Sequence, residues 1–111
     1  MKLVIAIVQD EDGAKLISTL MQEGYSVTKL ATTGGFLRAG NTTLLTGVED
    51  EKLDHCLEII EQIGKSRKQI INSNVGSFDG ALLSAAAHAN IEVTVGGATV
   101  FVLDVDQFKK F

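Results

Sequence analysis

The first half of the chain opens with an apolar segment and continues with a segment of helical periodicity. Residues 3–8 (LVIAIV) are continuously apolar and partly β-branched, which is typical of a central strand buried on both faces. Apolar residues then recur at helical spacing and predict a helix over about residues 12–23. Asp10 or Asp12 is expected to cap its start, and Gly24 stands where a left-handed C-terminal cap belongs.

Two strand-like segments flank a short glycine-rich connection. Residues 25–33 alternate between their two faces and are rich in threonine, and residues 41–48 form a second segment of this kind. Their close spacing predicts an antiparallel hairpin. A second helix is predicted to start at Glu49 or Asp50 and to end at Gly64, with an apolar stripe formed by Leu53, Leu57, Ile60 and Ile63.

The second half of the chain has a less regular pattern. Residues 65–90 predict a long mobile loop that opens with a short strand at about residues 68–72. The segments IEVTV and ATVFVLDV follow, and both are typical of strands. Gly96 and Gly97 separate them, so the glycine pair predicts a tight hairpin turn.

The order of these elements predicts an α+β fold. Strand, helix, strand, strand, helix and strand, with an extra hairpin, is the ferredoxin-like βαββαβ pattern. The chain has 111 residues, so we expect a single domain over residues 1–111. This fold places two helices on one face of an antiparallel sheet. Since the first strand is apolar on both sides, we expect other subunits to cover the second face.

Composition and charge narrow the classes of function. The formal net charge is -4 and the pI is about 5.0, so the surface disfavours DNA and RNA. A small anionic ligand stays compatible, because backbone N–H groups can hold phosphate without a basic surface. No apolar run approaches the roughly 20 residues that cross a bilayer, and charged residues follow the first run where a signal peptide has its cleavage site. We therefore expect a cytoplasmic protein with no membrane partner.

Few residues indicate catalysis or metal binding. Because Cys56 is the only cysteine, an internal disulfide and a four-cysteine zinc site are excluded. His55 precedes it, but neighbours on a helix point about 100° apart, so we expect a core thiol and a surface imidazole. Helix capping explains the acidic residues 10–12 without a metal, and His88 has no ligand partner at helical spacing. We expect no enzyme activity, no metal and no cofactor.

The strongest candidate for a binding site is the glycine- and threonine-rich segment 31–43. Its glycines leave the main-chain amides open to close approach, and Asn41 offers both a donor and an acceptor for the edge of a nucleobase. Phe36 offers a stacking surface, and Arg38 is the nearby cation. The alternative is a hairpin loop whose Phe36 packs into a neighbouring subunit. The segment is not a phosphate-binding P-loop, because the GxxxxGK[ST] pattern is missing.

Three segments resemble the PII-like cyclic di-AMP receptor family of Gram-positive bacteria: MKLVIAIVQDED, TKLATTGGFLRAGNTTLLTGVED and EVTVGGATVFVLDVDQF. The resemblance implies a PII-like, ferredoxin-like protomer, a homotrimer, and signalling rather than catalysis. It also implies that cyclic di-AMP binds in clefts between subunits. Carried over by position, the resemblance implies that Thr28 and Asn41 contact polar atoms of the ligand. It places Gly35, Phe36 and Leu37 along the adenine, with Phe36 stacking on it. Gly47 and Phe101 would line the pocket.

Two departures from the family pattern support an alternative function. Members of the family commonly carry arginine where this chain has Ser26, and the segment 65–90 differs from their pattern. The alternative is a divergent PII-like trimer that has lost or changed its ligand and acts as a protein-interaction module. In both cases the downstream protein is not named by the sequence.

Overall fold

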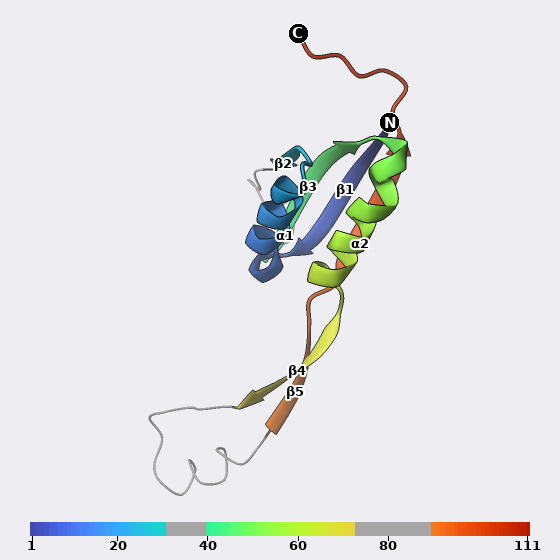
Figure 1. Cartoon of the computed structure of the whole chain (residues 1–111). Helices are drawn as coiled ribbons and strands as arrows, with labels where there is room; N and C mark the ends of the chain where they lie inside the picture. The colour runs from blue at the N-terminus through green and yellow to red at the C-terminus, as the bar shows by residue number, and fades with distance from the viewer. Residues whose placement is uncertain (31–39, 73–89) are drawn as a thin grey trace, which may run out of the picture. The chain divides into compact units, whose positions relative to one another are not determined.

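A computed structural model describes residues 1–30, 40–72 and 90–111 of the chain (Figure 1). The chain divides into two compact units. The first unit contains Met1–Lys65 and Gly96–Phe111, and the second contains Ser66–Val95. The predicted adenine-binding residues 35–37 lie outside the described residues, as does His88.

The first unit contains a four-stranded sheet and two α-helices. Its elements in chain order are β1 (Lys2–Gln9), α1 (Asp10–Gln22), β2 (Val27–Lys29), β3 (Asn41–Val48), the short 3-10 helix η1 (Asp50–Lys52), α2 (Leu53–Gly64) and β6 (Ala98–Asp104). The strands lie in the order β2-β3-β1-β6, and every neighbouring pair is antiparallel. This is the ferredoxin-like arrangement that the sequence predicts.

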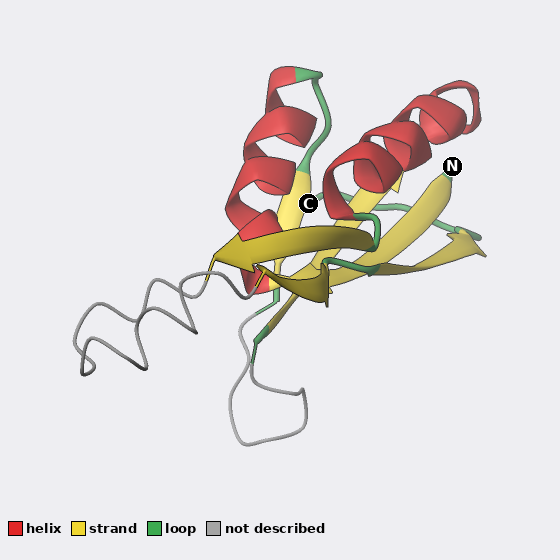
Figure 2. Ribbon diagram, turned by 90° about the horizontal axis from the view of Figure 1, so that it is seen from below, coloured by secondary structure: helices red, strands yellow, loops and turns green. Residues whose placement is uncertain are grey.

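Both helices cover the same face of the sheet (Figure 2). The even-numbered residues of β1 and β3 point to this face, because successive side chains of a strand alternate. Together with residues of the two helices they form a buried core, which contains Val4, Ala6, Val8, Leu16, Leu20, Tyr25, Leu44, Val48, Cys56, Ile59 and Ile60. The predicted hairpin of β2 and β3 is confirmed, with Thr28 opposite Leu45.

The second face of the sheet, which we call the open face, carries the odd-numbered residues of β1 and β3. The prediction that β1 is buried on both sides is wrong for a single chain, because Leu3, Ile5 and Ile7 are only partly buried. Phe101 of β6 pairs with Ile5 on this face, and its side chain is 53% exposed. The open face therefore leaves apolar side chains of β1 and β6 partly exposed in the single chain.

The start of α1 differs from the prediction. The helix begins at Asp10, and the capping position belongs to Gln9, which makes no side-chain capping hydrogen bond. The Asp10 carboxylate accepts a hydrogen bond from the Thr42 hydroxyl, so it connects the helix to β3. The helix end agrees with the prediction, because Gly24 adopts a φ of 90°, which favours glycine.

The second unit is a β-hairpin formed by β4 (Arg67–Asn72) and β5 (Asn90–Val95). The predicted long loop therefore includes β4, and residues 73–89 lie outside the described residues. An ion pair joins Lys68 and Glu92 at 3.5 Å. A two-stranded hairpin is marginally stable in water without further packing.

The prediction that Gly96 and Gly97 form a hairpin turn is wrong. The strand before them, β5, pairs with β4, whereas the strand after them, β6, pairs with β1. The chain thus changes from one sheet to another at this point. Both glycines have positive φ values, 80° and 112°, and the N–H of Gly97 donates to the carbonyl of Gly64 at 2.7 Å.

Candidate ligand-binding site

Four of the predicted site residues lie on the open face of the sheet. Thr28 lies opposite Leu45, which lies opposite Ile5, which lies opposite Phe101, so these four residues form one row across the sheet. Asn41 and Gly47 occupy odd-numbered positions of β3 and share the same face. The register of the sheet therefore assigns Thr28, Asn41, Gly47 and Phe101 to the side that the helices leave uncovered. Asn41, the first residue of β3, also lines a groove beside α1.

These residues do not converge on one point within a single chain. Thr28 and Phe101 belong to the two edge strands, β2 and β6, and three strand spacings separate them by about 14 Å. Asn41 and Gly47 lie near opposite ends of β3, about 20 Å apart along the strand. A small ligand that touches residues from both edges would need edges from different copies of the chain.

Thr43 is a further polar residue of the open face. Its side chain is buried, and its hydroxyl oxygen has no hydrogen-bond partner among the residues that the structure describes. A buried hydroxyl without a partner costs about 1–3 kcal/mol.

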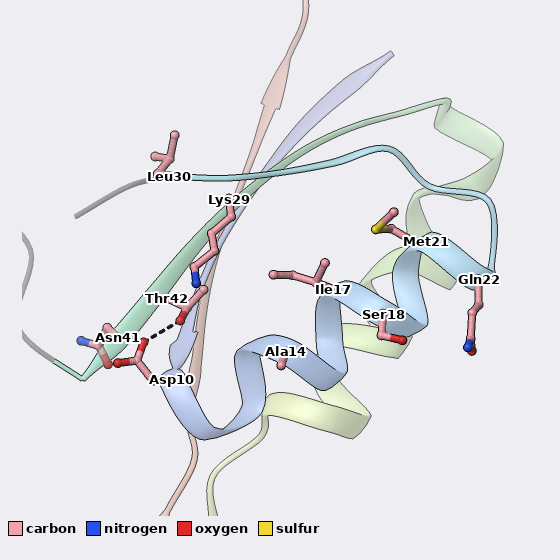
Figure 3. Close-up of a pocket in the computed structure, with 10 residues that line it drawn as sticks. All are labelled: Asp10, Ala14, Ile17, Ser18, Met21, Gln22, Lys29, Leu30, Asn41 and Thr42. Atoms are coloured by element: carbon pink, nitrogen blue, oxygen red, sulfur yellow. Dashed lines mark hydrogen bonds between the residues drawn. The ribbon is translucent and has the colours of Figure 1, made fainter. Parts of the chain in front are cut away.

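The described part of the chain has a groove between α1 and the hairpin of β2 and β3 (Figure 3). Its volume is about 1090 Å³, and it is lined by Asp10, Ala14, Ile17, Ser18, Met21, Gln22, Lys29, Leu30, Asn41 and Thr42. Among the predicted site residues that the structure describes, only Asn41 belongs to this lining. The sequence pattern of α1 predicted an amphipathic helix but not this groove. The groove depends on the distance between α1 and β2, which the pattern of one helix does not specify.

Asp10 and Thr42 connect one end of this groove to the strand that carries Asn41. The Thr42 hydroxyl donates to Asp10 Oδ1 at 2.6 Å, as Figure 3 shows. The N–H of Asp10 donates to the carbonyl of Gly40 at 2.8 Å. Sequence reasoning assigned Asp10 to helix capping and missed this contact, because its partner lies 32 residues away.

The neighbouring His55 and Cys56 do not form a catalytic pair. Cys56 is fully buried, and this burial raises the pKa of its thiol to about 11, so the reactive thiolate is scarce at neutral pH. His55 is exposed, and its Nδ1 lies 2.9 Å from the hydroxyl of Tyr25. The expected core thiol and surface imidazole are confirmed, and the described residues contain no cluster of metal-ligating side chains.

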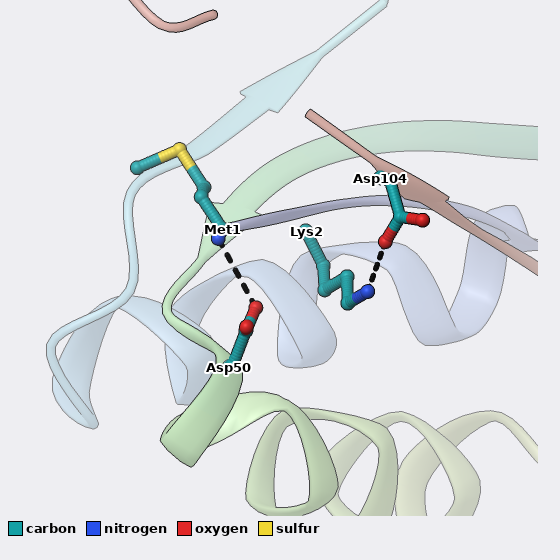
Figure 4. A network of polar contacts seen from close by, with 4 residues as sticks. All are labelled: Met1, Lys2, Asp50 and Asp104. Atoms are coloured by element: carbon teal, nitrogen blue, oxygen red, sulfur yellow. Dashed lines mark hydrogen bonds and ion pairs between the residues drawn. The ribbon is translucent and has the colours of Figure 1, made fainter. Parts of the chain in front are cut away.

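Two ion pairs lie at the end of the sheet where the chain begins (Figure 4). The N-terminal ammonium of Met1 lies 3.1 Å from Asp50, and Lys2 pairs with Asp104 across β1 and β6. The Lys2 contact raises the pKa of that lysine and lowers the pKa of Asp104 through a hydrogen bond and charge attraction. Exposed pairs of this kind contribute little to stability. The Lys2–Asp104 pair marks the register of β1 and β6, and the Met1–Asp50 pair joins the chain start to η1.

Comparison with known proteins identifies the class of this fold. The family model described as "Cyclic-di-AMP receptor" matches residues 1–111, and the chain belongs to this family. The predicted resemblance is thereby confirmed. Among solved structures, the chain is similar to a protein of Pediococcus pentosaceus that is described as functionally unknown. The two are 43% identical, the match covers 99% of this chain and 96% of the other, and the TM-score is 0.76. No helix in the described residues is long and apolar enough to cross a membrane.

Proposed function

We propose that this protein is a cytoplasmic receptor that binds cyclic di-AMP in clefts between the subunits of a homotrimer. The family supports a small nucleotide ligand and a signalling role. The trimer, the clefts and the contacts of Thr28, Gly35, Phe36, Leu37, Asn41, Gly47 and Phe101 are part of the proposal. The receptor has no catalytic step, and the ligand would act by changing which downstream protein binds.

The observation that carries the proposal is the distribution of the predicted residues over the open face. Thr28 and Phe101 lie on opposite edges of one sheet, about 14 Å apart. In the proposed trimer, the β2 edge of one copy would lie near the β6 edge of the next, which would bring such residues into one cleft. Packing of neighbouring copies against the open face would also cover the exposed Phe101.

The ligand contacts follow from the chemistry of the residues. Glycine at position 35 would let an adenine approach the main chain closely, and Phe36 would stack on its face. The amide of Asn41 can donate to and accept from the edge of the base. Thr28 would contribute a hydroxyl from the neighbouring strand, which the hairpin of β2 and β3 fixes relative to Asn41.

Calorimetric titration of the full chain with cyclic di-AMP tests the proposal. We expect saturable binding by the wild-type protein. Stacking on one aromatic ring is worth about 1–3 kcal/mol per base, so Phe36→Ala should weaken binding by roughly 5- to 150-fold. Phe108→Ala is the matched control, because it removes an exposed phenylalanine from a segment outside the proposed site. Absence of heat and of thermal stabilisation at high ligand concentration would refute the proposal.

Ser26 supports the alternative function, a divergent PII-like trimer that has lost or changed its ligand. This serine is exposed and directly precedes β2, where an arginine of other family members would add a cation near Thr28. A divergent trimer without cyclic di-AMP would keep the assembly and bind another nucleotide or only a protein. A thermal-shift panel of cyclic and linear nucleotides separates the two, because stabilisation by cyclic di-AMP alone supports the receptor.

A further inference from the structure

We propose that Asp10 and Thr42 are positioning residues that hold Asn41 in place for the cyclic dinucleotide; this inference rests on the proposed function. Asp10 makes contacts on both sides of Asn41. Its N–H donates to the carbonyl of Gly40 at 2.8 Å, and its carboxylate accepts from the Thr42 hydroxyl at 2.6 Å. Asn41 therefore lies between Gly40 and Thr42, both of which are hydrogen-bonded to Asp10.

Asn41 needs such support because it is the first residue of β3. It pairs with Gln9, the last residue of β1, so the ladder between these strands ends at this pair. Terminal pairs of a ladder open more easily than central ones. Asp10 directly follows Gln9 as the first residue of α1, which gives it the rigidity of the helix.

The contact at Thr42 is buried and closely packed. Thr42 is only 4% exposed, and a hydrogen bond to a charged carboxylate is stronger than one between neutral groups. Gly13 of α1 permits this approach, because a Cβ at that position would lie 2.9 Å from Thr42 Oγ1 and 3.1 Å from Thr42 Cβ. The first turn of α1 thus contacts Thr42 from the helix side.

The contact at Thr42 acts on Asn41 through the backbone of β3. Thr42 is buried against the helices, and Asn41, one residue earlier, is partly buried and lines the groove beside α1. A rotation of the strand at Thr42 would therefore also move the Asn41 amide. Loss of the Asp10–Thr42 hydrogen bond removes one of the contacts that oppose this rotation, without changing any residue proposed to bind the ligand.

The test measures the dissociation constant of cyclic di-AMP for variants of the full chain. Asp10→Ala and Thr42→Val each remove one partner of a charge-assisted hydrogen bond, and we expect each to raise the dissociation constant about tenfold. Because both remove the same contact, the double variant should lie within about threefold of either single variant. Thr42→Ser keeps the hydroxyl and should restore the wild-type value. Glu11→Ala removes an exposed acidic residue of the same helix turn and should leave binding unchanged.

A second measurement separates positioning from general stability. Tyr25→Phe removes a hydroxyl that donates to the Lys52 carbonyl on the other side of the molecule, and it should lower the urea midpoint without changing the dissociation constant. If the wild-type protein binds no cyclic di-AMP, the proposed function falls and this inference falls with it. If the wild type binds but both single variants stay within threefold of it, or if the double variant shows the product of the two losses, the inference alone is overturned. Should Asp10→Ala fail to fold, the comparison of Thr42→Val with Thr42→Ser decides between these outcomes.

Discussion

Replacement of Phe101 by alanine is expected to weaken self-association of the chain while leaving the protomer folded. Phe101 lies on the open face in β6, where it pairs with Ile5 of β1. The substitution removes the ring but keeps every backbone hydrogen bond of the ladder. The protomer should therefore unfold at nearly the wild-type urea concentration, whereas the surface available to a second copy becomes smaller.

The magnitude follows from the exposed area of the ring. A phenylalanine side chain buries roughly 150–250 Å² when it is fully covered. In the single chain Phe101 is 53% exposed, which leaves about 100 Å² for a neighbouring copy to cover. At about 25 cal/mol per Å², covering this area stabilises an interface by about 2.5 kcal/mol. Alanine retains a small part of this gain, so we expect a loss of about 2 kcal/mol, or roughly 30-fold in the association constant per interface.

Sedimentation equilibrium of ligand-free protein measures this loss directly. Met21→Ala is the matched control, because Met21 is 60% exposed but lies on α1, away from the open face. The control should assemble like the wild type, and Phe101→Ala should dissociate at higher protein concentration. Equal association constants for Phe101→Ala and the wild type, measured where both are partly dissociated, would show that the open face is not the interface.

Three other substitutions test separate parts of the structure. Burial raises the Cys56 pKa from about 9 to about 11, so the wild type should lose about 2–3 kcal/mol of stability from this group as the pH rises through this window. Cys56→Ala should lose correspondingly less, because only groups such as Lys2 and Tyr25 then keep a raised pKa; superimposable alkaline unfolding curves would contradict the assignment. Gly13→Ala should destabilise the protein by about 1–2 kcal/mol despite the higher helix propensity of alanine, because the new Cβ collides with Thr42; a raised melting temperature would argue against the close contact. Ser26→Arg should tighten cyclic di-AMP binding about three- to tenfold at low salt, with a smaller gain at high salt; an equal gain from Ser26→Gln would show that charge is not responsible.

Local patterns predicted most of the elements and their fold. The second α-helix ends at Gly64 as expected, and the strand at residues 41–48 has the predicted bounds. Periodicity and glycine position are properties of neighbouring residues, so they can be read directly from the chain. The expected core position of Cys56 beside an exposed His55 is likewise confirmed, since neighbouring residues of a helix point in different directions.

Predictions that depend on distant partners were less successful. Gly96 and Gly97 resemble a hairpin turn, but β5 pairs with β4 and β6 pairs with β1. The local sequence of a strand does not specify its partner, because several strands with the same alternating pattern could pair with it. Asp10 illustrates the same limit for side chains. A carboxylate at the start of a helix can cap that helix or bind a distant residue such as Thr42, and the sequence is the same in both cases.

The hydrogen bond between Gly64 and Gly97 has a consequence for how this protein can diverge. Its length of 2.7 Å means that the polypeptide leaves the ferredoxin-like unit and returns to it at adjoining points. The cost of closing a chain between two such points grows only slowly with its length. Insertions, deletions or replacements in the 66–95 region should therefore be tolerated while the sheet and both helices keep their sequence. Changes of sequence in this region need not disturb the packing of the sheet against its helices.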